Sequence, residues 1–323
     1  MPDDLDRLVL GGVPSLAAVD LAQQTGLPLA RLERIWRALG FPAIQPGMVA
    51  FNDADAAALN HLREALDSGL VDFDTAVGIT RALGQTTARL ADWTVTALMP
   101  KSDEVESPSD QHERRGQAAA ALVGELGPDF DQLIVYAWRR HLAAALSRAG
   151  AAAAGAADDS EETAHVTVGF ADLVQFTALS NELGEDRIGD LVEIFESRCQ
   201  DVVSGAGGRV IKSLGDSVLF AVLDPVKGLQ IAEGIVTVIG RDGRMPDVRI
   251  GLASGPVSLR LGDIFGPAVN MAARLTGVAR RNRIIIDEAT AALLPPDQFE
   301  CRRLPARPLR GFGLVEPIAV RRL

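Results

Sequence analysis

The two halves of the chain differ in how hydrophobic and polar residues alternate. Over residues 15–99, apolar residues recur at helical spacing between Gly and Pro positions, and no convincing strand alternation appears. From "HVTVGFADL" onward, short apolar runs typical of strands alternate with helical stretches. The pattern predicts a helical N-terminal domain followed by an α+β or α/β sandwich.

In the C-terminal half the pattern is regular enough to place individual elements. The predicted strands are 165–171, 209–214, 217–223, 247–253, 257–261, 283–287 and 315–321. The predicted helices are 175–183, 187–205, 225–239, 267–280 and 287–294. Further towards the N-terminus, "FDQLIVYAWRRHLAAALSRAGAAAA" predicts one long helix, and "QAAAALVGEL" predicts a shorter one before it.

Two polar segments indicate the boundaries. "MPKSDEVESPSDQHERR" (99–115) predicts a polar loop inside the N-terminal half. "GAADDSEET" (155–163) is small and acidic, and it predicts the interdomain linker. We therefore expect a helical domain over residues 1–154 and a second domain over residues 164–323.

Composition narrows the possible functions. The 323 residues exceed a usual single domain, and the net charge of -11 makes the chain a poor general binder of nucleic acid. Its two cysteines show no metal-ligand spacing, so we expect no disulfide framework and a reducing, cytoplasmic location. The acidic N-terminus is unlike a signal peptide, and no apolar run reaches the roughly 20 residues of a membrane span. We expect no transmembrane segment.

Two aspartates are candidate metal ligands. Asp172 ends the strand of "VTVGFADLVQFTALS", directly before a helix start, and Asp216 lies at the turn of "VIKSLGDSVLF". Mg²⁺ prefers one or two carboxylates and takes its other oxygens from substrate phosphates. Each residue also has a purely structural interpretation, Asp172 as a helix cap and Asp216 as a turn residue. Lys212, in the same hairpin, could equally extend its stem along apolar surface towards solvent.

A third segment, "GDIFGPAVNMAARLTG", carries further candidates. Asn270 and Arg274 are four residues apart, so a helix presents both on one face. An amide and a guanidinium together suit a transferring phosphoryl group, although a surface helix with an ordinary polar stripe is the commoner reason for such a pair. Asp263 precedes this helix by about one turn.

The segments "FADLVQFT", "IKSLGDSVLF" and "GDIFGPAVNMAARL" resemble, in order and spacing, the signature segments of class III nucleotidyl cyclases. The resemblance covers residues 164–323 and implies a ferredoxin-like α+β catalytic domain. It also implies that Asp172, Asp216 and the backbone carbonyl of Leu173 hold two Mg²⁺ or Mn²⁺ ions per active site.

The same resemblance implies the substrate contacts. Lys212 and Asp263 match the pair that contacts adenine in adenylyl cyclases, whereas guanylyl cyclases typically carry Glu and Cys there. Asn270 and Arg274 match the positions that orient the ribose and stabilise the transition state. The implied reaction is conversion of ATP to cyclic AMP and pyrophosphate.

Three weaker assignments and the assembly complete the expected site. Arg310, in "RPLRGFG", matches a position where the family often has a phosphate-binding lysine. Phe176 and Thr177, which close the first segment, are expected to contact substrate. In the family the sites form between two head-to-tail catalytic domains, so the resemblance implies a homodimer with two equivalent sites.

Two other functional classes are open. A degenerate cyclase domain could sense a nucleotide without converting it, although all six matching polar positions are intact. Residues 14–41 have the look of a helix-turn-helix with "TGLP" as the turn and Arg31, Arg34 and Arg37 on the second helix. Residues 1–150 hold 20 acidic residues against 13 Lys and Arg, which favours protein contacts over DNA.

The N-terminal half resembles that of soluble bacterial cyclases in which a helical domain inhibits the dimer until acid or a lipid-like ligand releases it. Residues 128–163 would then be the switch. An apolar stripe along them is interpreted as bundle core, or alternatively as a fatty-acid pocket: Leu133, Ile134, Ala137, Trp138, Leu142 and Leu146. His141 and His165 flank the switch and are candidate pH sensors, unless both are simply solvated.

Overall fold

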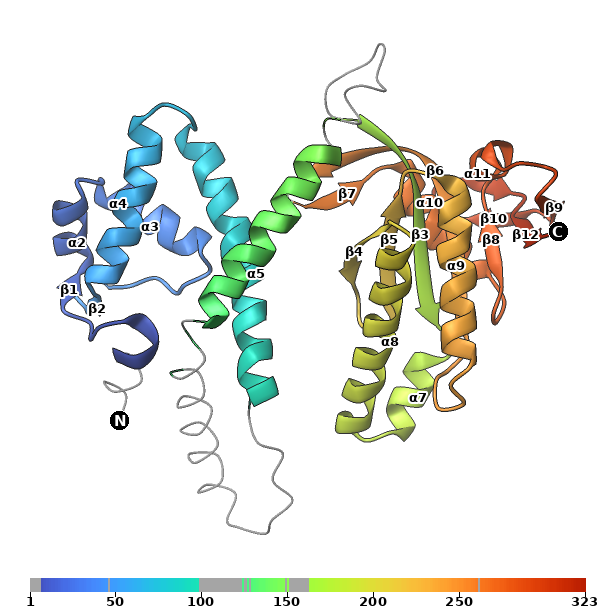
Figure 1. Ribbon diagram of the computed structural model, residues 1–323, viewed down its shortest axis with the longest axis horizontal. Coiled ribbons are helices and arrows are strands. Elements are labelled where there is room, and N and C mark those ends of the chain that lie inside the picture. The colour runs from blue at the N-terminus through green and yellow to red at the C-terminus, as the bar shows by residue number, and fades with distance from the viewer. Residues whose placement is uncertain are drawn as a thin grey trace, which may run out of the picture. The chain divides into compact units, whose positions relative to one another are not determined.

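The computed structural model describes residues 7–45, 47–98, 129–148, 163–260 and 262–323, together with Gly124, Gly127 and Gly150. The chain divides into two compact units, residues 1–151 and 152–323 (Figure 1). The expected polar loop at 99–115 lies outside the described residues. So does the expected linker at 155–163, except that Thr163 already begins a strand.

The first unit is helical apart from one small pair of strands. Its described helical segments are residues 7–10, α2 (Ala18–Thr25), α3 (Leu29–Ala38), α4 (Asp53–Asp67), α5 (Phe73–Leu98) and a further helix over residues 129–148. Strand β1 (Leu16–Ala17) pairs with β2 (Val49–Phe51), which the expectation of helices alone missed. Strands this short show no alternation in a sequence. Leu21, Leu32 and Phe51 form the buried centre of this unit.

The second unit is built on an eight-stranded sheet in the order β4-β5-β3-β6-β8-β12-β9, with β7 paired to β6 (Figure 1). Only the β6–β8 pairing is parallel among the described strands of this sheet. Its strands are β3 (Thr163–Leu173), β4 (Arg209–Ser213), β5 (Ser217–Val222), β6 (Val248–Arg260), β7 (Asp263–Phe265), β8 (Ile284–Ile286), β9 (Phe299–Arg303) and β12 (Ile318–Arg322). A separate hairpin joins β10 (Arg307–Leu309) to β11 (Gly313–Val315).

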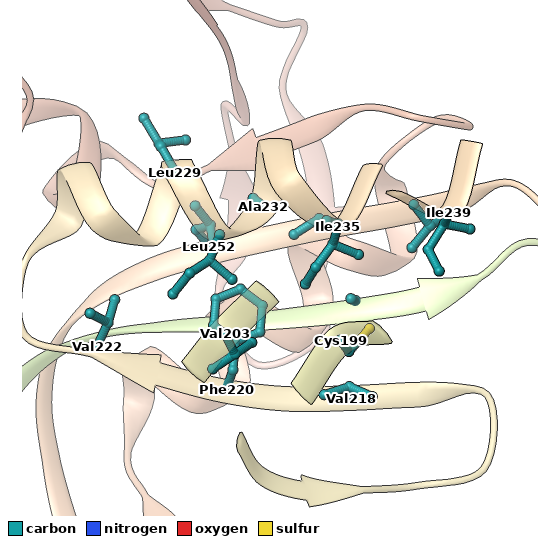
Figure 2. Close-up of a cluster of buried hydrophobic side chains, with 14 of the residues drawn as sticks. Cys199, Val203, Val218, Phe220, Val222, Leu229, Ala232, Ile235, Ile239 and Leu252 are labelled. Carbon is teal, nitrogen blue, oxygen red and sulfur yellow. The ribbon is translucent and has the colours of Figure 1, made fainter. Parts of the chain in front are cut away.

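Helices cover both faces of this sheet. They are α7 (Phe176–Glu182), α8 (Glu185–Gly205), α9 (Pro225–Gly240), α10 (Pro267–Val278) and α11 (Glu288–Leu293). Successive residues of a strand face opposite sides, and Phe220 of β5 packs in the cluster with α8 and α9 whereas Leu219 packs in the cluster with α10. Figure 2 shows Phe220 and its neighbours Val218 and Val222 among the side chains of the α8 and α9 cluster.

One glycine fixes how closely α10 approaches the sheet. A Cβ added to Gly251 of β6 would lie 2.4 Å from the backbone oxygen of Ala272 and 2.4 Å from the backbone nitrogen of Thr276. No side chain fits in that space, so the backbones of α10 and β6 pack directly against each other. The position of α10 therefore depends on a residue that has no side chain.

The predicted elements of the second unit are present, with local differences. The strands predicted at 247–253 and 257–261 are one continuous strand, β6, because the Gly-Pro dipeptide at 255–256 continues the pairing with β3 instead of turning. Strands β7, β9, β10 and β11 were not predicted, and β12 begins at Ile318 instead of residue 315. These strands are three to five residues long, too short to stand out in the hydrophobic pattern.

Candidate active site

Asp172 and Asp216 lie at one end of two paired strands. Asp172 is in register with Ser217 of β5, and the backbone nitrogen of Leu173 donates to the backbone oxygen of Asp216 at 2.9 Å. Gly215, at φ 67°, makes the tight β4–β5 turn that carries Asp216. Partial burial and then the neighbouring charge of Asp172 raise the pKa of Asp216. The two carboxylates therefore share one local environment.

Asp172 has two partners that sequence analysis missed. Its Oδ2 accepts a hydrogen bond from Nε of Arg249 at 2.6 Å, and its Oδ1 accepts one from the hydroxyl of Ser217. Arg249 stands opposite Asp172 in the β3–β6 register, 77 residues away in sequence. The signal available in the sequence was an arginine inside the apolar run "VRIGLASG". Arg249 brings a guanidinium, the group best suited to bidentate binding of phosphate, to the metal-ligand candidates.

The chain turns sharply after these residues. Gln175 has a left-handed backbone conformation, with φ 60°, and its Oε1 accepts from Arg281 at 2.8 Å. The side chain of Leu173 is buried, and that of Phe176 packs against the core beneath α8 and α9. Thr177 is exposed at the start of α7. The ring of Phe176 therefore packs against the protein core. The expected substrate contacts of Phe176 and Thr177 stay predictions.

Lys212 and Asp263 are in direct contact. Nζ of Lys212, on β4, lies 2.5 Å from Oδ2 of Asp263, on β7, although 51 residues separate them in sequence. The other oxygen of Asp263 accepts from the backbone nitrogen of Ile264 at 2.8 Å, which fixes the carboxylate. Both side chains remain partly exposed. A ligand can therefore reach the Lys212 donor and the Asp263 acceptor together. One donor and one acceptor side by side suit hydrogen bonding to the edge of a nucleobase.

Asn270 and Arg274 lie on α10, and both are exposed. Across the described residues, neither side chain has a hydrogen bond or ion pair. Arg310 is exposed in the turn between β10 and β11. These three polar groups are free to meet a ligand, and no contact within the chain joins them to the aspartates.

The metal-ligand candidates and Asp263 lie at opposite ends of β6. Asp172 pairs with Arg249 at the start of this strand, whereas Asp263 pairs with Arg260 at its end. Asp172 and Asp263 are therefore in register with opposite ends of one strand, whereas Lys212, the partner of Asp263, lies in the same β4–β5 hairpin as Asp216.

The donor set suits a hard divalent cation that is shared with a substrate. Within the described ranges, no group of three or more His, Cys, Asp or Glu side chains is arranged to hold a metal ion. Two interacting carboxylates, Asp172 and Asp216, match the one or two that Mg²⁺ uses when phosphates complete its coordination. The residues present fit a metal of this kind.

The candidate regulatory residues are all accessible. His141 is exposed on the helix of residues 129–148, and His165 is exposed on β3. Four residues of the predicted apolar stripe are exposed by 42–66%: Leu133, Trp138, Leu142 and Leu146. These four side chains stay exposed within one chain, whereas Ile134 and Ala137 are half-buried.

The helix-turn-helix segment exists, with α2 and α3 joined through Gly26 at φ 69°. Two of its three arginines contact α5, whereas Nε of Arg37 donates to the backbone oxygen of Glu33 on α3 itself. Arg34 forms an ion pair of 2.6 Å with Asp74, and the guanidinium of Arg31 lies 4.8 Å from the ring centre of Phe73. These contacts favour the interpretation that the motif packs against protein instead of docking on DNA. No described helix has the length and apolar character needed to cross a bilayer.

Comparison with known proteins defines the class. Residues 159–318 match the adenylate and guanylate cyclase catalytic domain, and residues 6–157 match the adenylate cyclase regulatory domain. The chain is 35% identical to an adenylate cyclase of Streptomyces coelicolor, across 97% of this chain and 87% of that protein. It is 34% identical to an adenylate cyclase of Glutamicibacter nicotianae, across 97% and 80%. These matches describe a cyclase catalytic domain preceded by a regulatory domain.

The chain belongs to the adenylate cyclase family, whose members are lyases. The expected α+β fold and the resemblance to class III cyclases are thereby confirmed. The chain is also 29% identical to a protein of Mycobacterium tuberculosis named as a pH-sensitive adenylate cyclase, across 95% of this chain and 78% of that protein.

Proposed function

We propose that this chain is an adenylyl cyclase that converts ATP to 3′,5′-cyclic AMP and pyrophosphate. The ribose 3′-oxygen attacks the α-phosphorus, the bond from that phosphorus to the bridging oxygen breaks, and the hydroxyl proton is lost. The observation that carries the proposal is the convergence of Asp172 and Asp216 at one end of paired strands.

Asp172, Asp216 and the backbone carbonyl of Leu173 would hold two divalent ions, Mg²⁺ or Mn²⁺. Such ions lower the pKa of a bound hydroxyl and neutralise phosphate charge. Arg249 orients Asp172 through its 2.6 Å contact and offers its remaining N–H groups to the phosphates. Asn270 and Arg274 orient the ribose and stabilise charge on the reacting phosphoryl group, and Arg310 holds the departing pyrophosphate.

Adenine specificity rests on Lys212 and Asp263. The lysine donates and the aspartate accepts, so the pair complements an acceptor and a donor on one edge of the base. Asp263 is held in place by the backbone of Ile264, so the pair is preorganised before substrate binds.

We further propose a head-to-tail homodimer. The match to the cyclase catalytic domain supports a two-fold arrangement in which the aspartates of one copy meet the base-contacting residues of another. Each dimer then holds two equivalent sites, and a lone chain is inactive. The exposed stripe on residues 129–148 is apolar surface that a second copy would cover, and a lipid ligand is the alternative occupant.

The test is substitution of the candidate metal ligands. Asp172→Ala or Asp216→Ala should each lower cyclic AMP formation by about 100-fold or more, because charge stabilisation of the reacting phosphates is lost. Activity is measured with ATP in Mg²⁺ and in Mn²⁺, and melting temperature reports folding. Asp201→Ala, an exposed acid on α8, is the matched control and should leave activity unchanged. Activity within a few-fold of the parent in either site variant would refute the assignment.

A further inference from the structure

A cavity lies among the C-terminal strands of the second unit, and its lining contains none of the candidate active-site residues. It has a volume of about 610 Å³ and is lined by the end of α10 and the loop after it, by β8, β9, β10 and β12, and by the segments joining them. These strands lie together at the C-terminal end of the chain in Figure 1. The arginines that line the cavity are Arg280, Arg283, Arg302, Arg307 and Arg321.

The cavity is strongly positive in an acidic chain. Glu300 is the one acidic residue in its lining, and it pairs with Arg321 at 2.5 Å between Nε and Oε2. The other four arginine side chains have no hydrogen bond or ion pair with any described residue. Elsewhere in the same unit, Arg198, Arg249 and Arg322 each have an acidic partner. All four side chains are solvent-exposed, so their guanidinium groups are available to an anion that enters the cavity.

The backbone holds these arginines in fixed positions. The turn that carries Arg280 and Arg283 is closed by a hydrogen bond from the nitrogen of Arg283 to the oxygen of Arg280, at 3.1 Å. Asn282 anchors this turn through its side-chain nitrogen, which donates to Asp247 at 2.6 Å, and through its backbone nitrogen, which donates to Val248. On the paired strands β9 and β12, Arg302 is in register with Ala319. The backbone positions of Arg280, Arg283 and Arg302 are therefore fixed, while their side chains are exposed.

The chemistry of the lining selects the ligand. Guanidinium groups bind phosphate oxygens with two parallel hydrogen bonds, and several of them together suit a group with several adjacent phosphates. The surrounding Ile285, Leu304 and Ala319 supply an apolar wall, typical of small-molecule sites of this volume. A net charge of -11 for the whole chain disfavours nucleic acid, whose binding needs a broad basic surface.

We propose that this cavity binds a diphosphate or triphosphate chain, either as free pyrophosphate or as the phosphate tail of a nucleotide. Val278 in its lining is one helical turn beyond Arg274 on α10. The binding itself requires no turnover and does not rest on the proposed cyclase reaction.

The experiment measures binding by the full chain in EDTA, with isothermal titration calorimetry of pyrophosphate, ATP and orthophosphate. The double variant Arg283→Gln, Arg302→Gln should bind pyrophosphate about 100-fold more weakly, at about tenfold for each charged hydrogen-bonding group removed. The matched control is Arg241→Gln, an exposed arginine on the same unit outside the cavity, which should bind as the parent does. The variant Asp216→Ala, altered at the candidate active site, should also retain pyrophosphate binding.

If the double variant loses affinity equally for pyrophosphate and for ATP, the phosphate chain that both ligands share is assigned as the ligand. A loss for pyrophosphate alone would assign the free diphosphate. Unchanged pyrophosphate affinity in the double variant, or no pyrophosphate binding by the parent chain, would overturn the proposal. Neither result depends on cyclic AMP formation, so failure of the cavity proposal and failure of the cyclase proposal are distinguishable.

Discussion

At the scale of single residues, the contact between Lys212 and Asp263 makes a direct prediction about base choice. Lys212→Glu combined with Asp263→Cys should lower ATP turnover by about 100-fold or more, because polar groups of adenine are then left unpaired. The measurement is kcat/KM for ATP and GTP on the double variant and the parent. An unchanged ratio of the two values would show that these side chains do not face the base.

A half-buried aspartate gives a prediction about stability. Asp287 caps α11 by accepting from the backbone nitrogen of Thr290 at 2.8 Å, and burial raises its pKa above the ordinary 3.8. The folded state therefore holds this proton more tightly than the unfolded state, and the aspartate costs stability increasingly as pH rises from about 3.8 through its folded pKa. Asp287→Asn keeps the capping oxygen and should raise the melting temperature at pH 7.

The advantage of Asp287→Asn should shrink as the pH is lowered towards 4, where the parent side chain becomes protonated. Thermal melts across this range test the sign. Asp224→Asn is the control, because Asp224 also caps a helix, α9, but is exposed. An equal rise in melting temperature in both variants would show that burial of Asp287 is not the cause. A rise in Asp287→Asn that does not change with pH would show the same.

The candidate residues could be proposed from sequence because each belongs to a short local segment, and their roles stay predictions. Asp172, Asp216 and Asn270 lie in motifs whose spacing is visible without a fold. Arg249 and Ser217 were missed because their contacts with Asp172 depend on strand register over 77 and 45 residues. Pairing between distant strands leaves no local signal.

At the scale of elements, the packing of α10 on β6 predicts a strong effect of one small substitution. Gly251→Ala places a methyl group 2.4 Å from the backbone of α10, so the helix that carries Asn270 and Arg274 must move. A displacement of about 1 Å in such groups can cost about 100-fold in rate. Overpacking should also lower stability by about 1–3 kcal/mol.

The matched control is Gly255→Ala on the same strand. Its added Cβ would lie 3.4 Å from Cβ of Ala268, also on α10, which is close to ordinary contact. We expect this variant to keep most of its activity and melting temperature. Full activity in Gly251→Ala would mean that the position of α10 does not limit catalysis.

Element types were predictable from sequence where the periodicity runs over many residues. Helices α8 and α9, with 21 and 16 residues, were placed close to their observed ends. The Gly-Pro dipeptide at 255–256 was misinterpreted as a break, because its local preference for a turn is overridden by pairing with β3 along the whole length of β6. Short strands such as β10 and β11 form through tertiary pairing and carry no period of their own.

At the scale of the whole molecule, the regulatory match over residues 6–157 predicts that the N-terminal unit controls the catalytic unit. We expect the unit to hold the two catalytic domains of the dimer apart from their productive arrangement, with acid as the releasing signal. His141 and His165 are both solvent-accessible and are the two candidate residues for such a response.

The full chain is compared with a fragment of residues 160–323. This fragment contains both hydrophobic clusters that pack on the large sheet. Specific activity is measured from about pH 8 down to about pH 5.5, the range in which histidine gains its charge. The full chain should gain activity on acidification and the fragment should not. His141→Gln and His165→Gln in the full chain then show whether either residue carries the response. The fragment lacks the N-terminal unit, so any inhibition by that unit must make the full chain less active than the fragment at neutral pH. If the two pH profiles were parallel and the activities equal, the N-terminal unit would only support assembly.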